Sequence, residues 1–317
     1  MKENCFVGID TSNYTTSVAI ADEDGRVIAN LKRPLPVKEG ERGLRQSDAV
    51  FAHVKNLPDI MKELAGLLEE KNVLAVGYSA SPRDAEGSYM PCFLSGKAAA
   101  YSFAATLASV PVYSFSHQKG HVMAALYSAG AEHLISDRFG AFHVSGGTTE
   151  VLIATPHESA FLVENVGGTE DLNAGQLIDR TGVMMGISFP CGREMEFLAL
   201  ENSKKIPAPR ISVKGLTCNL SGGENIAAKL FGETADKGLV SAAVFDFVGR
   251  TLIELSENLT ESYGEIPIVY SGGVMSNSII KDMLRVRKNT FFAEPAFSAD
   301  NAAGTALLCR RKYLFEK

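Results

Sequence analysis

The chain of 317 residues carries a net charge of −6, and 45% of its residues are hydrophobic while 21% are charged. These values are typical of a globular protein with ample core, and the acidic balance argues against an obligate nucleic-acid coat protein. The length favours two domains or one bilobal unit, and no apolar run reaches the roughly 18 residues of a membrane span.

The N-terminal sequence and the cysteines point to a cytoplasmic protein. MKENCFVGID leads directly into a strand pattern, without the apolar region of a signal peptide. The five cysteines are odd in number and form no C-x-x-C pair, so we expect reduced thiols and neither a disulfide framework nor a cysteine–zinc site. The basic clusters at 285–288 and 310–312 are interpreted as solvated helix ends, although a local basic face could still bind RNA.

Alternating apolar residues in the first half predict an antiparallel meander, followed by alternating helix and strand. Strands are expected over 5–12, 15–21, 26–31, 73–80 and 111–115, and helices over 50–68 and 94–108. The first of these helices is amphipathic, because apolar residues that include Val54, Ile60, Leu64 and Leu67 recur at helical spacing.

A short repeat indicates that the chain is duplicated. TTSVAIA (15–21) lines up with TTEVLIA (148–154), and a polar turn at the end of an apolar strand precedes each copy. Because each copy opens one half of a chain of two-domain length, duplication explains the match better than chance. We therefore expect an N-terminal lobe over 1–135 and a C-terminal lobe over 136–317, with the last helix packing back toward the first lobe.

The second half repeats the pattern of strands followed by helices. Strands are expected over 139–145, 150–155, 160–166 and 266–273, and helices over 171–185, 192–201, 236–262 and 300–313. A segment rich in serine and glycine, VKGLTCNLSGGEN (213–225), is expected to introduce a further helix.

Three turns combine small residues with the end of a strand: DTSNYTT (10–16), SGGTT (145–149) and SGGVMSN (271–277). Backbone N–H groups in such turns can approach an anion closely, and the third turn also precedes a helix N-terminus. The phosphate-loop candidates in the first and third turns are Ser12, Thr15, Thr16, Gly272 and Gly273. Tight turns need glycine in any case, but two equivalent hairpins and a strand–Gly-Gly–helix turn favour a nucleotide in a cleft between the lobes.

The segment SHQKGH places His117 and His121 four residues apart, where a strand pattern gives way to a helix pattern. Two imidazoles on one helix face form a candidate metal site, and surface or capping histidines are the alternative. A zinc protease would need a glutamate directly after the first histidine as its general base. Gln118 and Lys119 supply no base, so a protease is disfavoured.

Seven ordered motifs resemble those of the TsaD/glycoprotease family. They are HxxxH, VSGGTT, AGQLID, FPCGRE, VKGLTCNLSGG, SGGVMSN and SADNAAG, and they accompany the duplicated hairpins over nearly the whole chain. Members of this family transfer threonylcarbamoyl from an adenylate to the adenosine beside the tRNA anticodon. The resemblance implies an α/β fold, the duplicated actin-like ATPase (ASKHA, ribonuclease H-like) fold of sugar kinases, with two lobes around a nucleotide cleft.

The resemblance also implies site residues and partners. It assigns one divalent metal, Fe or Zn, to His117, His121 and Asp300, with Asp300 opening the terminal helix; such a metal can polarise a phosphate or carbonyl oxygen. It assigns an adenine nucleotide or adenylate to Val144, Ser145, Gly146, Gly147, Thr148, Asp179, Gly192 and Asn277. The partners that it implies are tRNA, a smaller paralogous subunit and an ATPase subunit; a homodimer stays open, and no membrane is involved.

This sequence departs from the family pattern mainly by losing acids. The positions that differ are Tyr14, Thr15, Lys119, Gly168, Leu172 and Gln176, and Cys191 stands where the family has glycine. Replacing carboxylates with neutral or basic groups should weaken cation binding or alter the substrate, and Lys119 would repel a cation unless it points away. We therefore interpret the chain as a divergent paralogue.

Two hypotheses follow for the function. The first is a metal-assisted threonylcarbamoyltransferase that acts on tRNA, and the second is a catalytically impaired nucleotide-binding paralogue that acts as a partner or regulator. A sugar or acyl kinase of the same fold is disfavoured, because such an enzyme does not need HxxxH together with Asp300.

Overall fold

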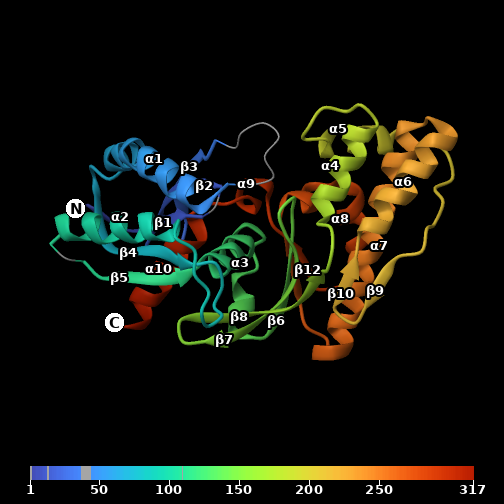
Figure 1. Cartoon of the computed structure of the whole chain (residues 1–317). Coiled ribbons are helices and arrows are strands. Elements are labelled where there is room, and N and C mark those ends of the chain that lie inside the picture. Colours follow the sequence, from blue (N-terminus) through green and yellow to red (C-terminus); the bar gives the residue numbers. More distant parts are fainter. Residues whose placement is uncertain (1, 13, 37–43, 109) are drawn as a thin grey trace. The chain divides into compact units, whose positions relative to one another are not determined.

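The computed structural model describes residues 2–12, 14–36, 44–108 and 110–317 (Figure 1). The chain divides into two compact units. Unit 1 consists of Met1–Ser136, Thr155–Glu164 and Phe297–Lys317, and unit 2 consists of Asp137–Ala154 and Asn165–Ala296. The C-terminal helix therefore belongs to the same unit as the N-terminal strands.

Unit 1 is built on a five-stranded sheet with the order β3-β2-β1-β4-β5. The strands are β1 (Glu3–Thr11), β2 (Thr15–Asp22), β3 (Val27–Pro34), β4 (Lys71–Ser81) and β5 (Val112–Ser116). The first three form the predicted antiparallel meander, while β4 and β5 continue the sheet in parallel. Each parallel strand follows a helix, because a parallel pair needs a crossover connection.

Helices cover both faces of this sheet. They are α1 (Gln46–Leu67), α2 (Phe93–Thr106), α3 (His117–Ser128), the 3-10 turn η1 (Glu132–Ser136) and α10 (Ala303–Phe315). Successive side chains of a strand point to opposite faces, so Val7 and Ile9 pack into one core cluster with α1 and α2. Phe6 packs into a different cluster with Cys309 and Tyr313 of α10.

Unit 2 contains the body of a seven-stranded sheet with the order β12-β11-β6-β7-β8-β10-β9. Its strands are β6 (Phe139–Val144), β7 (Thr149–His157), β8 (Ala160–Thr169), β9 (Ser212–Lys214), β10 (Thr217–Asn219), β11 (Ile268–Ser271) and β12 (Thr290–Phe292). Its helices are α4 (Ala174–Met184), α5 (Gly192–Leu200), α6 (Ser221–Thr234), α7 (Lys237–Tyr263), the 3-10 turn η2 (Gly273–Ser276) and α8 (Ser278–Leu284), and α9 (Pro295–Ser298) follows at the unit boundary.

The two sheets share one topology. In the first, an antiparallel meander β3-β2-β1 continues through the parallel strands β4 and β5; in the second, the meander β8-β7-β6 continues through the parallel strands β11 and β12. The equivalent hairpins, β1–β2 and β6–β7, are the segments in which the sequence repeat was found. The duplicated fold is therefore confirmed at the level of strand order.

Several elements differ from the sequence predictions. Val54 and Leu67 lie on the expected apolar face of α1 but are 56% and 45% exposed, whereas the polar His53 is buried. The segment 213–225 was expected to lead into a helix, but it first forms the β9–β10 hairpin, and α6 starts only at Ser221. The strands and turns of this hairpin are too short for periodicity to reveal them.

Asp300 was expected to open the terminal helix, but it lies three residues before α10, in the segment that follows α9. Asn301 orders this segment, since its side-chain amide donates to two carbonyl groups and its oxygen accepts from the N–H of Ala303 at 3.0 Å.

All five cysteines lie in the described residues and are buried free thiols. Among the described helices, none combines the length and apolar character of a membrane span.

Candidate metal centre and nucleotide loops

The two histidines of SHQKGH lie on the first turns of α3. Ser116 forms the N-cap of this helix, because its hydroxyl accepts a hydrogen bond from the N–H of Lys119 at 3.1 Å. His117 and His121 are therefore one helical turn apart on the same face, with ring centroids separated by 4.2 Å.

Asp300 reaches this pair from the segment before α10. Its Oδ1 lies 3.2 Å from Nε2 of His121 and 3.6 Å from Nε2 of His117. One ligand atom from each of the three side chains falls within 4.8 Å of the others, and all three side chains are half-buried. The donor set of two imidazole nitrogens and one carboxylate oxygen suits a divalent ion such as Zn or Fe, with further positions left for other ligands.

Two glycines let α10 pack closely against α3 and β1, which brings Asp300 to the histidines. A Cβ atom added to Gly304 would lie 1.9 Å from the carbonyl oxygen of Gly120, so no side chain fits between the helices at this point. Gly8 on β1 has the same role beneath α10, since a Cβ there would lie 2.4 Å from the N atom of Ala306. The position of Asp300 thus depends on small residues elsewhere in the chain.

Asp10, at the end of β1, orients the first histidine. Its Oδ1 lies 2.8 Å from Nδ1 of His117, and its side chain is 1% exposed. A carboxylate on one ring nitrogen fixes the orientation of the imidazole and leaves the other nitrogen for a metal, which is a common arrangement around metal-bound histidines. Asp10 was not predicted from the sequence; the signal that could have identified it is an acid that ends an otherwise apolar strand.

The charges of His117, Asp10 and Asp300 stabilise one another in the metal-free chain. Burial would lower the pKa of His117, but Asp10 and Asp300 raise it to about 10. Burial would raise the pKa of Asp300, but the adjacent imidazoles of His117 and His121 hold it well below its usual range. The pKa of Asp10 is likewise lowered, because His117 outweighs the effect of burial.

These shifts predict a pH dependence for the metal-free protein and for metal binding. The raised pKa of His117 contributes stability that is complete below about pH 6.5 and is lost as the pH rises through about 10. The lowered pKa values of the two acids contribute stability that is lost below about pH 4.

Because a metal needs a neutral imidazole, metal binding at pH 7 should release about one proton from His117. Calorimetry with Co²⁺ in buffers of different ionisation enthalpy measures this number, and a value of zero would contradict the assignment of His117.

Lys119, which lies between the two histidines in sequence, forms an ion pair with Asp84. Its Nζ lies 3.2 Å from Oδ2 of Asp84, which also accepts a hydrogen bond from the N–H of Val163 at 3.3 Å. This ion pair compensates the positive charge that the sequence places beside the candidate metal ligands.

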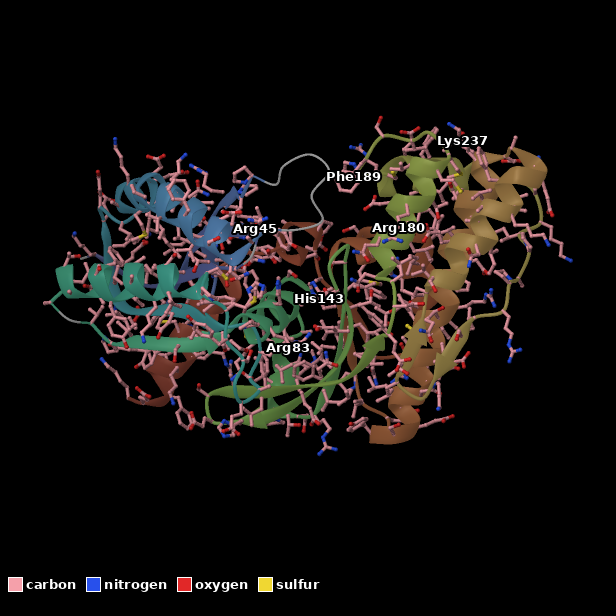
Figure 2. All side chains as sticks on the ribbon, viewed as in Figure 1. Arg45, Arg83, His143, Arg180, Phe189 and Lys237 are labelled. Atoms are coloured by element: carbon pink, nitrogen blue, oxygen red, sulfur yellow. The ribbon has the colours of Figure 1, made fainter. Side chains whose placement is uncertain are left out.

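The glycine-rich turn between β6 and β7 is open to a ligand. The Ser145 hydroxyl accepts hydrogen bonds from the N–H groups of Gly147 and Thr148, which closes the turn from within. Gly146 and Gly147 are exposed, and a Cβ atom on either would meet no described atom within 4 Å. Val144, by contrast, is fully buried as the last residue of β6. His143, labelled in Figure 2, lies one residue earlier and hydrogen-bonds Ser271 of β11 at 3.1 Å.

The N-terminus of α4 packs directly against this turn. The N–H of Gly175 donates to the carbonyl oxygen of Ser145 at 3.1 Å, and the side-chain amide of Asn173 donates to that of Gly147 at 2.9 Å. A Cβ atom on Gly175 would lie 2.6 Å from the N atom of Gly146. The N–H groups of Gly147, Thr148 and Gly175 are thus bonded within the protein, and the part of the turn that is open to a ligand lies at Gly146 and Gly147.

Two glycine variants distinguish a glycine that contacts the ligand from a glycine that is needed for packing. Gly147→Ala should leave the free energy of unfolding within about 0.5 kcal/mol of the wild type and weaken the binding of an adenine nucleotide, because the added methyl group points into open space. Gly175→Ala should destabilise the chain by about 1–3 kcal/mol, because its methyl group collides with Gly146. Urea unfolding and nucleotide titration measure both effects, and equal stability losses would contradict this difference.

The remaining nucleotide candidates also lie in unit 2, and two of them have structural partners. Asp179 on α4 accepts a hydrogen bond from the N–H of Cys191 at 2.9 Å, just before Gly192 begins α5. Burial raises the pKa of Asp179, although this hydrogen bond opposes the effect. Asn277 is the N-cap of α8, where its side-chain oxygen accepts from the N–H of Ile280 at 3.0 Å.

The phosphate-loop candidates differ in how open they are. Gly272 is buried with φ +98°, and a Cβ there would lie 2.2 Å from the carbonyl oxygen of Val144, whereas Gly273 faces open space among the described atoms. In the first hairpin, Thr15 is half-buried and Thr16 is fully buried, with its hydroxyl bonded to His53. Ser12 is also buried, and no described residue hydrogen-bonds its hydroxyl.

Three residues that stand where the family pattern has an acid now have structural roles in unit 2. Gly168 has φ +143°, and a Cβ there would lie 2.2 Å from the carbonyl oxygen of Thr149. Leu172 is buried in the core of unit 2. Gln176 accepts a hydrogen bond from the N–H of Asn173 at 3.3 Å, as the usual glutamate of a capping box would do.

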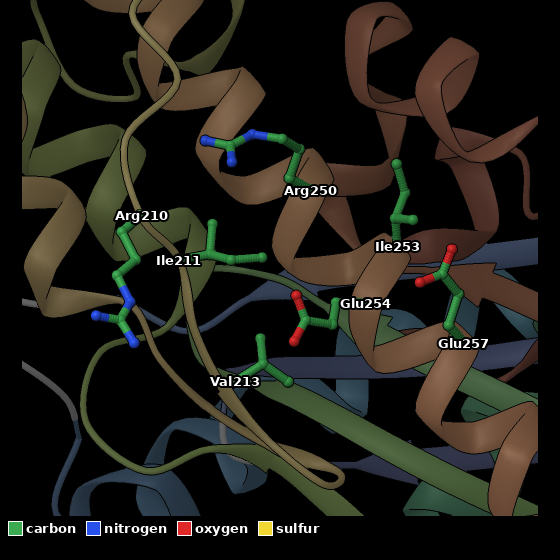
Figure 3. A pocket seen from close by; sticks show the side chains of 7 residues that line it. All are labelled: Arg210, Ile211, Val213, Arg250, Ile253, Glu254 and Glu257. Carbon is green, nitrogen blue, oxygen red and sulfur yellow. The ribbon is translucent and has the colours of Figure 1, made fainter.

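One groove of about 550 Å³ lies in unit 2 between the start of β9 and α7 (Figure 3). Its lining residues are Arg210, Ile211, Val213, Arg250, Ile253, Glu254 and Glu257. None of the predicted metal or nucleotide residues lines this groove.

Comparison with solved structures identifies the fold. The chain is similar to component A of the (R)-2-hydroxyglutaryl-CoA dehydratase of Acidaminococcus fermentans, with a TM-score of 0.55 at 15% identity over 98% of this chain and 99% of the other. It is also similar to a ROK family glucokinase from Streptomyces griseus in complex with glucose and AMPPNP, with a TM-score of 0.53 at 14% identity over 97% and 99% of the two chains. The predicted duplicated actin-like ATPase fold is thereby confirmed.

Comparison with sequences identifies the family. The tRNA N6-adenosine threonylcarbamoyltransferase of Methanopyrus kandleri is 27% identical over 305 residues, which cover 94% of this chain and 84% of that protein. A probable bifunctional tRNA threonylcarbamoyladenosine biosynthesis protein of Methanothermobacter thermautotrophicus is 27% identical over 98% of this chain, which spans 56% of that longer protein. The model of the TsaD family, tRNA N6-adenosine threonylcarbamoyltransferase, matches residues 38–307, so the chain belongs to this family.

Proposed function

We propose that the chain is a metal-assisted acyltransferase, which moves a threonylcarbamoyl group from threonylcarbamoyl-adenylate to an anticodon-loop adenosine of tRNA. The observation that carries this proposal is the convergence of His117, His121 and Asp300, with Asp10 behind the first ligand. Family membership supports the tRNA substrate.

In the proposed reaction, the exocyclic nitrogen of adenosine forms a bond with the carbamoyl carbon of the adenylate. The bond between that carbon and the phosphate oxygen breaks, AMP leaves, and the nitrogen loses one proton. A metal held by the two histidines and Asp300 would act as a Lewis acid toward an oxygen of the adenylate. The open part of the turn, at Gly146 and Gly147, would lie against the nucleotide, and the positive end of the α4 dipole would favour its phosphate.

A second candidate function is that of a nucleotide-binding partner or regulator without turnover. The observation that favours it is that the residues that stand in place of the family's acids fit their surroundings without a carboxylate. Gly168 has no room for a side chain, and Leu172 is committed to the core. Restoring acids at these positions would therefore require the surrounding backbone to move.

One assay distinguishes the two functions. Purified protein, loaded with Fe or Zn, is incubated with threonylcarbamoyl-adenylate and unmodified tRNA, and the tRNA nucleosides are analysed by mass spectrometry. An extract from a strain that lacks its own transferase supplies the smaller paralogous subunit and the ATPase subunit in a parallel reaction. Threonylcarbamoyladenosine in either reaction, lost with chelator, supports the enzyme. Adenylate binding without product supports the regulator, and the absence of both contradicts both functions.

A further inference from the structure

A buried histidine outside the candidate metal site holds the turn next to it. His53 lies on α1 and is 0% exposed. Its Nε2 lies 2.8 Å from the carbonyl oxygen of Ser12, and its Nδ1 lies 2.8 Å from the hydroxyl oxygen of Thr16. The ring therefore connects both sides of the hairpin formed by β1 and β2.

The partners of His53 fix its tautomer. A carbonyl oxygen can only accept a hydrogen bond, so the proton is on Nε2, and Nδ1 accepts from the hydroxyl of Thr16. Burial lowers the pKa of His53, although the hydrogen bond to Ser12 opposes the effect. The neutral ring is thus a donor on one side and an acceptor on the other.

The peptide groups of Ser12 link His53 to the metal centre. The carbonyl of Ser12 accepts from His53, while its N–H donates to Oδ2 of Asp10 at 3.3 Å. The other oxygen of Asp10 lies 2.8 Å from Nδ1 of His117. The Ser12 hydroxyl has no hydrogen-bond partner among the described residues, so its backbone contacts are what hold this residue in place.

We propose that His53 is a positioning residue for the metal centre: by holding Ser12, it keeps the Asp10 carboxylate in the orientation that fixes the ring of His117. This inference rests on the metal site of the proposed function. The competing explanation is that His53 only fastens α1 to the hairpin, in which case its loss would affect the stability of unit 1 and not the affinity for metal.

Asn56 provides a matched control for the competing explanation. It lies on the same helix, three residues after His53, and its side-chain amide donates to the hydroxyl of Thr16 at 3.2 Å. It also donates to the carbonyl oxygen of Arg33 at 3.5 Å, and neither of these hydrogen bonds involves Ser12. Asn56→Ala therefore removes a bond between the same helix and hairpin while the contact between His53 and Ser12 stays in place.

The experiment is a Co²⁺ titration of the metal-free full chain, followed by the visible absorption of the bound ion, with thermal unfolding of each metal-free variant measured in parallel. His53→Ala should lower the affinity for Co²⁺ about tenfold, the low end of the effect of outer-shell partners, and alter the absorption spectrum. His53→Gln should restore most of the affinity, because its amide can donate to Ser12 and accept from Thr16. If His53→Ala does not fold, His53→Asn replaces it, since the shorter amide cannot reach both partners.

Wild-type affinity in His53→Ala or His53→Asn would overturn the inference, and so would an equal loss in Asn56→Ala. If the wild-type chain binds Co²⁺ and only the His53 variants are impaired, the inference and the metal site are both supported. If the wild-type chain does not bind Co²⁺, both the metal site and this inference are contradicted. If the wild-type chain and the His53 variants all bind Co²⁺ equally tightly, the inference is wrong while the metal site stands.

Discussion

His117→Ala, His121→Ala and Asp300→Ala should each lower the affinity for Co²⁺ by more than the roughly 10–100-fold that the loss of an outer-shell partner costs. Each variant removes one of the three ligands that the described residues provide, and two remaining ligands hold a divalent ion poorly. Asp10→Asn should fall within the 10–100-fold range, because it weakens the orientation of His117 and leaves all three ligands in place.

His157→Ala is the matched control for these variants. His157 is an exposed histidine on β7, so its loss should leave the affinity for Co²⁺ at the wild-type value. A titration followed by absorption or calorimetry gives the affinities of the five variants and of the wild type. If the ligand variants bound Co²⁺ as tightly as His157→Ala, the three residues would not be the metal site.

Gly304→Ala should disturb both the fold and the metal site. The new methyl group would lie 1.9 Å from the carbonyl oxygen of Gly120, so α10 must move away from α3. Overpacking of this kind costs about 1–3 kcal/mol of unfolding free energy. Asp300 lies four residues before Gly304, so the same movement should carry its carboxylate away from the histidines and lower the affinity for Co²⁺.

Gly66→Ala is the control for this prediction. Gly66 lies in α1 of the same unit, and a Cβ atom there meets no described atom within 4 Å. The substitution should raise the unfolding free energy by about 0.4–1 kcal/mol, because alanine restricts the unfolded chain and favours the helix. Urea unfolding measures both variants. A Gly304→Ala protein with wild-type stability and metal affinity would show that the contact between α3 and α10 does not position Asp300.

Much of the fold could be predicted because its signals are local. Alternating apolar residues revealed the strands of both meanders, and the repeat TTSVAIA/TTEVLIA identified the two equivalent hairpins. The β9–β10 hairpin was missed because strands of three residues carry almost no periodicity. Val54 was expected on the buried face but is exposed, and His53, which the apolar pattern does not mark, is buried, because tertiary hydrogen bonds can outweigh the hydrophobic pattern of a helix.

The candidate site was only partly predictable, since its parts are distant in sequence. The spacing of His117 and His121 is visible on one helix, but Asp300 was assigned through family resemblance, not through any local pattern. Asp10 was not predicted, because an acid at the end of an apolar strand does not show that its carboxylate meets a histidine 107 residues later. Lys119 was expected to repel a cation unless it points away, and its ion pair with Asp84, which the sequence does not reveal, compensates its charge.

The metal content of the protein purified without chelator is the most direct measurement of the central claim. Elemental analysis of the wild-type chain should find about one equivalent of Fe or Zn per chain, and the double variant His117→Ala/His121→Ala, purified in parallel, should contain almost none. Equal metal content in the two proteins, or none in the wild type even after incubation with either ion, would contradict a metal centre at His117, His121 and Asp300.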